Sequence, residues 1–184
     1  IRLFLKNMLY TKRKAALFFI VCLIFFFLTY NDVKSSEINS ISGYAKVTDG
    51  DTLKINTFKI RLHGIDAPEK KQLCKRAYLT IMIFTFYEDY SCGQKSTEAL
   101  IEKINNQKII CNILGIDYFK RLIGECYKMK TNLNSWLVSN GHAVAFRKYS
   151  KKYVSQESLA KQEKKGMWQG KFEMPWDYRK SKKN

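Results

Sequence analysis

Four acidic residues and one arginine lie close together in the stretch VTDGDTLKINTFKIRLHGIDAPE, residues 47–69. Side chains two positions apart in a strand share a face, so Asp49 and Asp51 are expected to project together, and Gly50 lets a ligand or the backbone approach closely. Adjacent carboxylates repel each other unless a cation lies between them. The spacing therefore favours a cation site, with an ordinary surface turn as the alternative.

The following strand-like run carries Arg61, and Asp66 and Glu69 come after it. Strict alternation would place Arg61 and Asp66 on opposite faces, but Gly64 permits a bend or bulge that brings both to one site. The spacing is not that of an EF-hand loop. Carboxylates, backbone carbonyls and water are nevertheless the ligands of hard divalent cations, Ca²⁺ above all.

Length and charge limit the kind of protein this can be. The chain has 184 residues, enough for one domain with a substantial core, and a formal net charge of +17. Residues 147–183 contain twelve Lys or Arg and four acidic residues. This excess favours a polyanionic partner such as DNA or RNA, and a solvated lysine-rich surface is the alternative.

An apolar run, AALFFIVCLIFFFL at residues 15–28, directly follows a basic cluster at residues 12–14. This is the layout of a secretory signal, and the run is shorter than the about 20 apolar residues of a spanning helix. No small-x-small cleavage site follows it, so an uncleaved anchor stays an alternative. From the signal-like layout we predict an exported protein, periplasmic or extracellular, in which residues 1–36 are a signal peptide or a membrane anchor acting through residues 15–30.

The short β-rich runs GYAKVT, DTLKIN and FKIRLHGI predict an antiparallel meander, and KIICNIL and RLIGECY predict a second hairpin. Helical patterns occur in STEALIEKI, LNSWLVSNG and YVSQESLAKQEKKGMW. We expect a mainly β, α+β fold: a five-stranded oligonucleotide-binding (OB) barrel with about three peripheral helices. The expected layout is a linker at 37–42, the barrel domain at 43–178 and a basic tail at 179–184.

Cysteine usage fits an exported domain, because four cysteines remain when Cys22 in the apolar run is set aside. In the second hairpin, a register in which paired residue numbers sum to about 237 places Cys111 opposite Cys126, so that a cross-strand disulfide fits. Cys74 and Cys92 then form the second pair. Zinc ligation is the competing use, and no C-x₂-C spacing supports it. The apolar segment 75–91 between the second pair is expected to fold over the barrel, with contact to a membrane or a partner as alternatives.

Several motifs together resemble the staphylococcal nuclease (thermonuclease) family: D-G-D-T, R-L-x-G-I-D-A-P-E, and D-Y-F-K-R-L-I-G-E at residues 117–125. The similarity extends from about Tyr44 to Trp176 and includes NSWLVSNGHAVAFRKYS and KKGMWQGKFEMPW. It implies a monomeric, Ca²⁺-dependent nuclease that cuts DNA and RNA with little sequence preference. A catalytically weak nucleic-acid-binding OB module anchored at the membrane is the main alternative, and a cationic membrane-tethered protein is a second one.

The resemblance also implies a ligand set for the ion. The carboxylates of Asp51 and Asp66 and the backbone carbonyl of Ala67 would bind Ca²⁺, and Asp49 would contact it through water. Glu69 would position the attacking water and act as general base.

Arginines would bind the scissile phosphate, since a guanidinium stays charged and binds two oxygens at once. By resemblance these are Arg61 and Arg121. Before Arg121 the family usually has Tyr-Gly, whereas this chain has Phe119-Lys120. Phe119 and Phe146 are further expected to contact the substrate. Arg147 is expected to flank it as part of the basic surface, with a solvated face as the alternative.

Overall fold

The computed structural model describes residues 18, 20–24 and 39–182 of the chain. Contacts divide the chain into one unit that ends at Glu37 and a second that begins at Ile38, and every element named below belongs to the second. The signal peptide or anchor expected over residues 1–36 falls almost entirely outside the described residues. Among the helices that the structure does describe, none combines the length and apolar composition needed to cross a bilayer.

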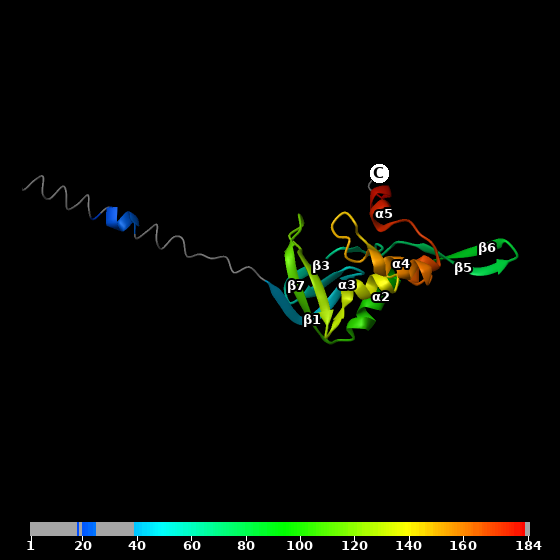
Figure 1. The fold of residues 1–184 in the computed structure, drawn as a ribbon, viewed down its shortest axis with the longest axis horizontal. Helices are drawn as coiled ribbons and strands as arrows, with labels where there is room; N and C mark the ends of the chain where they lie inside the picture. The colour runs from blue at the N-terminus through cyan, green and yellow to red at the C-terminus, as the bar shows by residue number, and fades with distance from the viewer. Residues whose placement is uncertain (1–17, 19, 25–38, 183–184) are drawn as a thin grey trace, which may run out of the picture. The chain divides into compact units, whose positions relative to one another are not determined.

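Five strands form a closed barrel (Figure 1): β1 (Ser40–Asp49), β2 (Thr52–Ile55), β3 (Phe58–Leu62), β7 (Lys108–Ile116) and β8 (Leu122–Lys128). Antiparallel pairing gives the order β3-β2-β1-β7-β8, and a parallel pairing between β3 and β8 closes the ring. The predicted mainly β OB barrel is confirmed. Closure leaves no free edge among these strands.

The barrel interior is built by alternation along the strands. Leu53 and Ile55 of β2 and Ile60 of β3 are fully buried, while Lys54 between them is exposed. Burying an aliphatic side chain of this size stabilises the fold by about 1.5–3 kcal/mol. The predicted register of the second hairpin is confirmed, since Cys111 lies opposite Cys126. Both disulfides, Cys74–Cys92 and Cys111–Cys126, are present.

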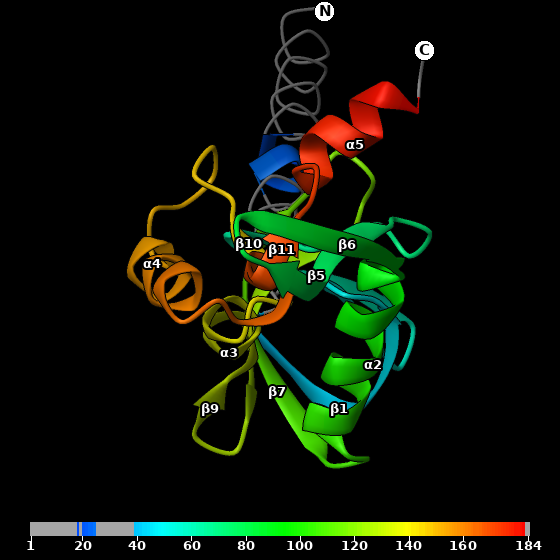
Figure 2. The same ribbon diagram turned by 90° about the vertical axis from the view of Figure 1, so that its right-hand side faces the viewer.

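Helices pack against the barrel strands (Figure 2). Helix α2 (Cys92–Ile104) packs on β1, and α3 (Leu133–Ser139) contacts both β8 and α4 (Val154–Gln162). The single helix expected through Met167 and Trp168 is wrong in its second half. Helix α4 ends at Gln162 because Lys164 adopts a left-handed conformation (φ 50°), and a separate 3₁₀ turn covers Gly166–Gln169.

Two short pairings connect the barrel to the rest of the domain. Strand β4 (Ile65–Asp66) pairs with β10 (Val144–Ala145), and β9 (Thr131–Asn132) extends the sheet beyond β8. A last helix, α5 (Pro175–Ser181), follows with proline in its first turn. Part of the segment expected as a basic tail from residue 179 is thus helical.

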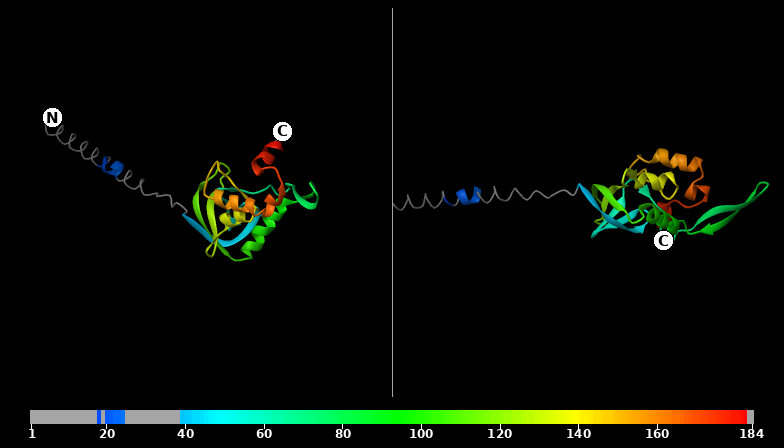
Figure 3. Two further views of the ribbon diagram at one scale, coloured as in Figure 1. Left: turned by 45° about the vertical axis from the view of Figure 1, so that its right-hand side comes forward. Right: turned by 90° about the horizontal axis from the view of Figure 1, so that it is seen from below.

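The apolar segment 75–91 does not fold over the barrel, so that expectation is wrong. It forms a hairpin of β5 (Cys74–Ile81) and β6 (Phe84–Tyr90), whose base pairs with β11 (Gly170–Lys171). Figure 3 shows this hairpin extending away from the rest of the domain. Every residue of β5 after Cys74 is exposed, because the hairpin packs on other elements only at its base.

Candidate active site

A cavity of about 850 Å³ opens beside the barrel, where the turns after β1 and β3 meet the tip of the β7–β8 hairpin and helix α5. Its volume lies in the range of small-molecule and cofactor sites. The lining contains most of the residues expected to do chemistry: Asp49, Asp51, Arg61, Ala67, Glu69, Phe119, Arg121 and Phe146. Asp66 lies behind this surface and is fully buried.

Asp51 lies in the turn between β1 and β2, and only 4% of its surface is exposed. Its carboxylate accepts hydrogen bonds from Arg61 Nη1 at 2.8 Å, from the Thr52 hydroxyl at 3.0 Å and from the backbone N–H of Ala67 at 3.1 Å. Charged groups buried to this degree require such partners. The bonds fix the carboxylate toward the β3–β4 turn.

Asp66 reaches the same place because the chain reverses direction after β3. Gly64 has φ +73°, a left-handed conformation that glycine adopts without strain, and β4 is then held by its pairing with β10. Arg61 Nη2 donates to Asp66 Oδ1 at 2.6 Å while its Nη1 donates to Asp51. The bend proposed at Gly64 is therefore present. One guanidinium fork thus bridges the two carboxylates.

Asp49 is the third carboxylate of this group. Its Oδ1 accepts a hydrogen bond from the backbone N–H of Asp51 at 3.1 Å. Burial, together with the negative charge of Asp51, raises the pKa of Asp49 to about 6. Closely spaced, partly desolvated carboxylates shift in this way because each disfavours ionisation of the other. Burial is the larger cause of this shift, and the charge of Asp51 adds to it.

Glu69 lies at the cavity rim, with 44% of its side chain exposed. Its backbone is fixed by two hydrogen bonds with the buried Gln72, at 2.7 and 3.2 Å, and by the close approach of Gly93 at the start of α2. A Cβ atom at Gly93 would lie 1.8 Å from the Glu69 carbonyl oxygen, so only glycine fits there. The carboxylate therefore extends from a rigid turn into the cavity.

Arg179 of helix α5 was not foreseen as a site residue. Its Nη1 donates to Asp66 Oδ1 at 3.1 Å and to Glu69 Oε1 at 2.9 Å, and its Nη2 donates to Asp66 Oδ2 at 2.8 Å. Partial burial lowers the pKa of Arg179, but hydrogen bonds with Asp66 and Glu69 outweigh burial and raise it above its ordinary value. For the carboxyl of Asp66 the effect of burial is the opposite: burial raises its pKa, and the hydrogen bond from Arg179 opposes that rise.

An aromatic pair holds α5 in this position. Trp176, on the first turn of α5, stacks on Phe146 with ring centroids 5.4 Å apart and an interplanar angle of 6°. Tyr149 meets the same Phe146 ring edge-on at 4.9 Å. Phe146 does line the cavity as expected, but one of its faces is covered by α5 rather than open to a base.

Arg121 lies on the β7–β8 tip, at the other side of the cavity. Its backbone N–H and its Nε both donate to Asp117, at 2.9 and 2.8 Å, and its guanidinium lies 5.5 Å from the ring centre of the exposed Phe119. Lys120, at the position where the family usually has glycine, adopts φ +60°. The turn is therefore retained despite the lysine, and Arg121 still faces the cavity.

Arg147 is the expected substrate contact that the structure places elsewhere. Its Nη2 donates to Glu157 Oε2 at 2.5 Å, and it does not line the cavity. Glu157 is fully buried and also accepts from the Ala145 backbone N–H at 3.1 Å and from Lys161 Nζ at 3.1 Å. A buried carboxylate needs a counter-charge, and Arg147 provides it.

The donor chemistry of the site fits a hard divalent cation, since Asp51 and Asp66, which Arg61 bridges, offer oxygen ligands only. Within residues 18, 20–24 and 39–182, however, no three His, Cys, Asp or Glu side chains already cluster in a metal-ligating arrangement. Arg61 and Arg179 instead donate to the Asp51 and Asp66 oxygens that a cation would use. Cation binding thus requires a guanidinium to move.

Comparison with known proteins was consistent with this geometry. The family model described as "Staphylococcal nuclease homologue" matches residues 59–170. The chain is 32% identical over 136 residues to the succinoglycan biosynthesis protein ExoI of Rhizobium meliloti, a match covering 72% of this chain and 67% of the relative. It is 28% identical over 147 residues to the probable staphylococcal-like nuclease CAN3 of Oryza sativa subsp. japonica, covering 78% of this chain and 34% of the relative. An "uncharacterized endonuclease" of Haemophilus influenzae is 30% identical over 130 residues, a match covering 67% of this chain and 63% of the relative. The chain thus spans about a third of the rice protein's length.

Proposed function

Because the chain belongs to the staphylococcal nuclease family, whose members include nucleases and endonucleases, we propose that it hydrolyses phosphodiester bonds of DNA or RNA with the help of Ca²⁺. The observation that carries this proposal is the Arg61 fork between Asp51 and Asp66, at a cavity that Glu69 and Arg121 also line. Carboxylates, a base and guanidinium groups at one cavity are the parts that phosphodiester hydrolysis requires.

The carboxylates of Asp51 and Asp66 and the carbonyl of Ala67 would hold the ion, with Asp49 contacting it through water. When bound, the ion supplies positive charge against the negative charge that develops on the phosphate. Arg179 would have to give up its bonds to Asp66, because the guanidinium and the ion compete for the same oxygens. Its release also frees the carboxylate of Glu69.

Glu69 is the general base in this scheme. Its carboxylate is fixed at the cavity rim and partly open to solvent, so it can orient a water molecule and accept the proton as the water attacks phosphorus. Attack adds a negative charge to a five-coordinate phosphorus. Arg61 and Arg121, which both line the cavity, would neutralise this charge and so lower the barrier.

Weak sequence preference follows from the same parts. The charged groups of the cavity suit the phosphate backbone, which carries no sequence information. Phe119 is exposed at the rim and offers a face on which any base can stack. We further propose that the protein is exported and monomeric, a location supported by its two disulfides.

A second function, nucleic-acid binding without cleavage, is favoured by one observation. Arg61 and Arg179 already satisfy the carboxylates of Asp51 and Asp66, so the domain does not need a cation to hold its site together. In that case the basic surface alone would hold the polyanion.

One experiment separates the two functions. The purified protein is incubated with single-stranded DNA in Ca²⁺ or in a chelator, alongside the variants Glu69→Gln and Glu163→Gln. The second variant is the matched control, since Glu163 is half exposed and pairs with Lys165 away from the cavity. Hydrolysis predicts cutting that requires Ca²⁺ and falls about a hundredfold or more in Glu69→Gln only. DNA retained intact in Ca²⁺ would indicate the binding module, and cutting that persists in the chelator would contradict the proposed mechanism.

A further inference from the structure

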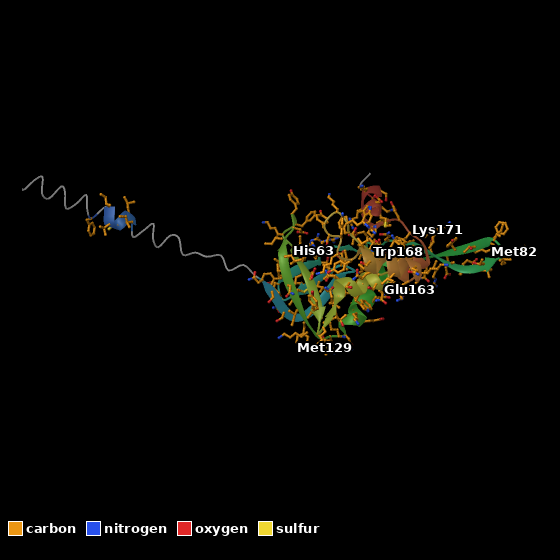
Figure 4. All side chains as sticks on the ribbon, viewed as in Figure 1. His63, Met82, Met129, Glu163, Trp168 and Lys171 are labelled. Atoms are coloured by element: carbon orange, nitrogen blue, oxygen red, sulfur yellow. A yellow bond between two sulfur atoms is a disulfide. The ribbon has the colours of Figure 1, made fainter. Side chains whose placement is uncertain are left out.

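A strongly exposed apolar surface lies at the tip of the β5–β6 hairpin (Figure 4). Met82 and Ile83 form its two-residue turn and are 92% and 87% exposed, and Phe84 beside them is 66% exposed. A soluble surface rarely gathers large apolar side chains in this way without a partner. None of these residues lines the cavity, so the proposed hydrolysis does not explain them.

The hairpin carries no charge over its outer part. Residues 77–87, AYLTIMIFTFY, contain no Asp, Glu, Lys or Arg. One face presents Leu79, Ile81, Phe84 and Phe86, which are cross-strand partners. The other face presents Thr80 and Thr85, whose hydroxyls lie 3.3 Å apart and satisfy each other. Neither face therefore exposes a strongly hydrated group near the tip.

Polarity changes in order from the tip to the base. Behind the apolar tip come Tyr78 and Tyr87, and behind these are charged residues, with Arg76 paired to Glu88 at 2.6 Å. Lys171 of β11 adds a further positive charge at this level, with its Nζ 4.7 Å from the Tyr87 ring centre. Tyrosine favours the boundary between an apolar and an aqueous phase, and lysine the aqueous side of it.

We infer from this arrangement that the hairpin tip inserts into the surface of an anionic lipid bilayer. The apolar surface is greatest at the outer end rather than on one flank, which suits endwise insertion into a plane better than docking along a protein groove. Residues 39–182 also carry a net charge of +12, so an anionic membrane attracts the domain as a whole.

Backbone chemistry limits the depth of insertion. A two-stranded hairpin has unpaired N–H and C=O groups along its edges, and these cannot enter the hydrocarbon core without a large cost. From Leu79 to Met82 the strand advances about 10 Å, at roughly 3.3 Å per residue. This distance is comparable to the depth of about 5–10 Å to which amphipathic helices enter the membrane interface. The tip thus reaches the boundary of headgroups and acyl chains, and the tyrosines remain among the headgroups.

The test uses a polarity-sensitive fluorophore at two matched positions in the full chain. Cys22, the cysteine outside the disulfides, is replaced by serine, and a new thiol is introduced by Met82→Cys or, as control, by Met129→Cys. Both methionines are at least 80% exposed and have left-handed backbone conformations, with φ of 54° and 51°. Figure 4 shows them at separate ends of the domain, Met82 at the hairpin tip and Met129 beside the barrel.

Vesicles of phosphatidylcholine with phosphatidylglycerol are expected to shift the emission at position 82 to the blue, and lipid-borne quenchers should reduce it. Position 129 should not respond. The control also separates tip insertion from membrane binding by the N-terminal apolar segment. Binding through that segment would bring vesicles to both variants, but only a tip that inserts would place its label in lipid.

The double variant Ile83→Ser, Phe84→Ser, carrying the label at 82, should need about tenfold more lipid for the same shift. Its unfolding temperature checks that the domain remains folded. The inference is overturned if position 82 does not respond to vesicles, if 129 responds equally, or if 82 shifts with protein concentration in the absence of lipid, which would indicate contact between two copies.

Discussion

Arg179 and Asp66 form a two-pronged ion pair across 113 residues of sequence, with Nη1 on Oδ1 at 3.1 Å and Nη2 on Oδ2 at 2.8 Å. Asp66 is fully buried, and the pair places a cationic group on a carboxylate assigned to a cation. Helix α5 therefore contributes a residue to the site, and an ion that binds Asp66 has to displace Arg179.

Replacing Arg179 by alanine should strengthen Ca²⁺ binding, because a positive charge that competes with the ion for Asp66 is removed. Hydrogen bonds to charged groups contribute about 1.5–3 kcal/mol each, so we expect the dissociation constant to fall by about tenfold. Titration calorimetry on chelator-treated protein measures it. Lys180→Ala is the matched control, since it removes the same charge from a neighbouring residue whose side chain is 80% exposed. Weaker or unchanged binding in Arg179→Ala would show that the arginine supports the ion site instead.

Lys120→Gly should stabilise the domain by about 1 kcal/mol, since a left-handed backbone disfavours every residue with a Cβ atom. The gain should appear as a higher midpoint in denaturant. Lys54→Gly serves as the control, because Lys54 is an equally exposed lysine within strand β2 and the same substitution there should lower stability. A loss of stability in Lys120→Gly would mean that the side chain, rather than the turn geometry, stabilises this tip.

Asn134→Ala should destabilise the domain by about 3 kcal/mol, because several buried backbone groups lose their partner. The Asn134 amide donates to the carbonyls of His63 and Gly124, at 2.9 and 3.2 Å, and accepts from the N–H of Cys126 at 3.1 Å. It thereby fixes the turn that precedes Asp66. Equilibrium unfolding measures the change, with Asn112→Ala on exposed β7 expected to stay within about 0.5 kcal/mol. Equal effects at both positions would contradict this role.

Acid should weaken the domain partly through Glu157. Burial raises the pKa of this carboxylate, but hydrogen bonds from Arg147, Lys161 and Ala145 outweigh burial and hold the pKa below its ordinary value of 4.5. A pKa lowered by folding contributes stability that is present above the unfolded value and lost as pH falls through the folded value.

Glu157→Gln should therefore cost about 2 kcal/mol near neutral pH, a figure reduced because Arg147 and Lys161 are half exposed. The difference from the wild type should shrink as the pH falls below about 4.5. Urea unfolding across this range measures it, and Glu163→Gln at the exposed end of the same helix should change stability by less than about 0.5 kcal/mol. A difference that stays constant with pH would exclude Glu157 from the acid response.

The barrel and the acidic group were predictable because both are encoded locally. Alternation along β2 and β3 marks the buried face, and the single Cys111–Cys126 pairing fixes the register of a hairpin whose strands are neighbours in sequence. Gly64 likewise signals the bend that brings Arg61 to Asp66, since all three lie within six residues.

The parts that were missed depend on contacts between distant segments. Nothing near Arg179 indicates that its helix returns to Asp66, because the contact is fixed by the stacking of Trp176 on Phe146. Arg147 was assigned to the substrate because Glu157, on a helix with polar neighbours, gives no sign of being buried. The expectation that segment 75–91 folds over the barrel is wrong because apolar composition indicates that a segment needs a partner surface but not which surface that is.

The Cys74–Cys92 bond closes a covalent ring that contains the whole β5–β6 hairpin. A protease acting on the exposed turn at Met82 and Ile83 would therefore nick the chain without releasing a fragment. The two pieces of the nicked molecule would stay covalently linked until a reductant broke the disulfide, and all of the cavity residues would stay joined to the barrel. In an oxidising environment outside the cell the disulfide persists, so such a cut would leave the rest of the domain unchanged.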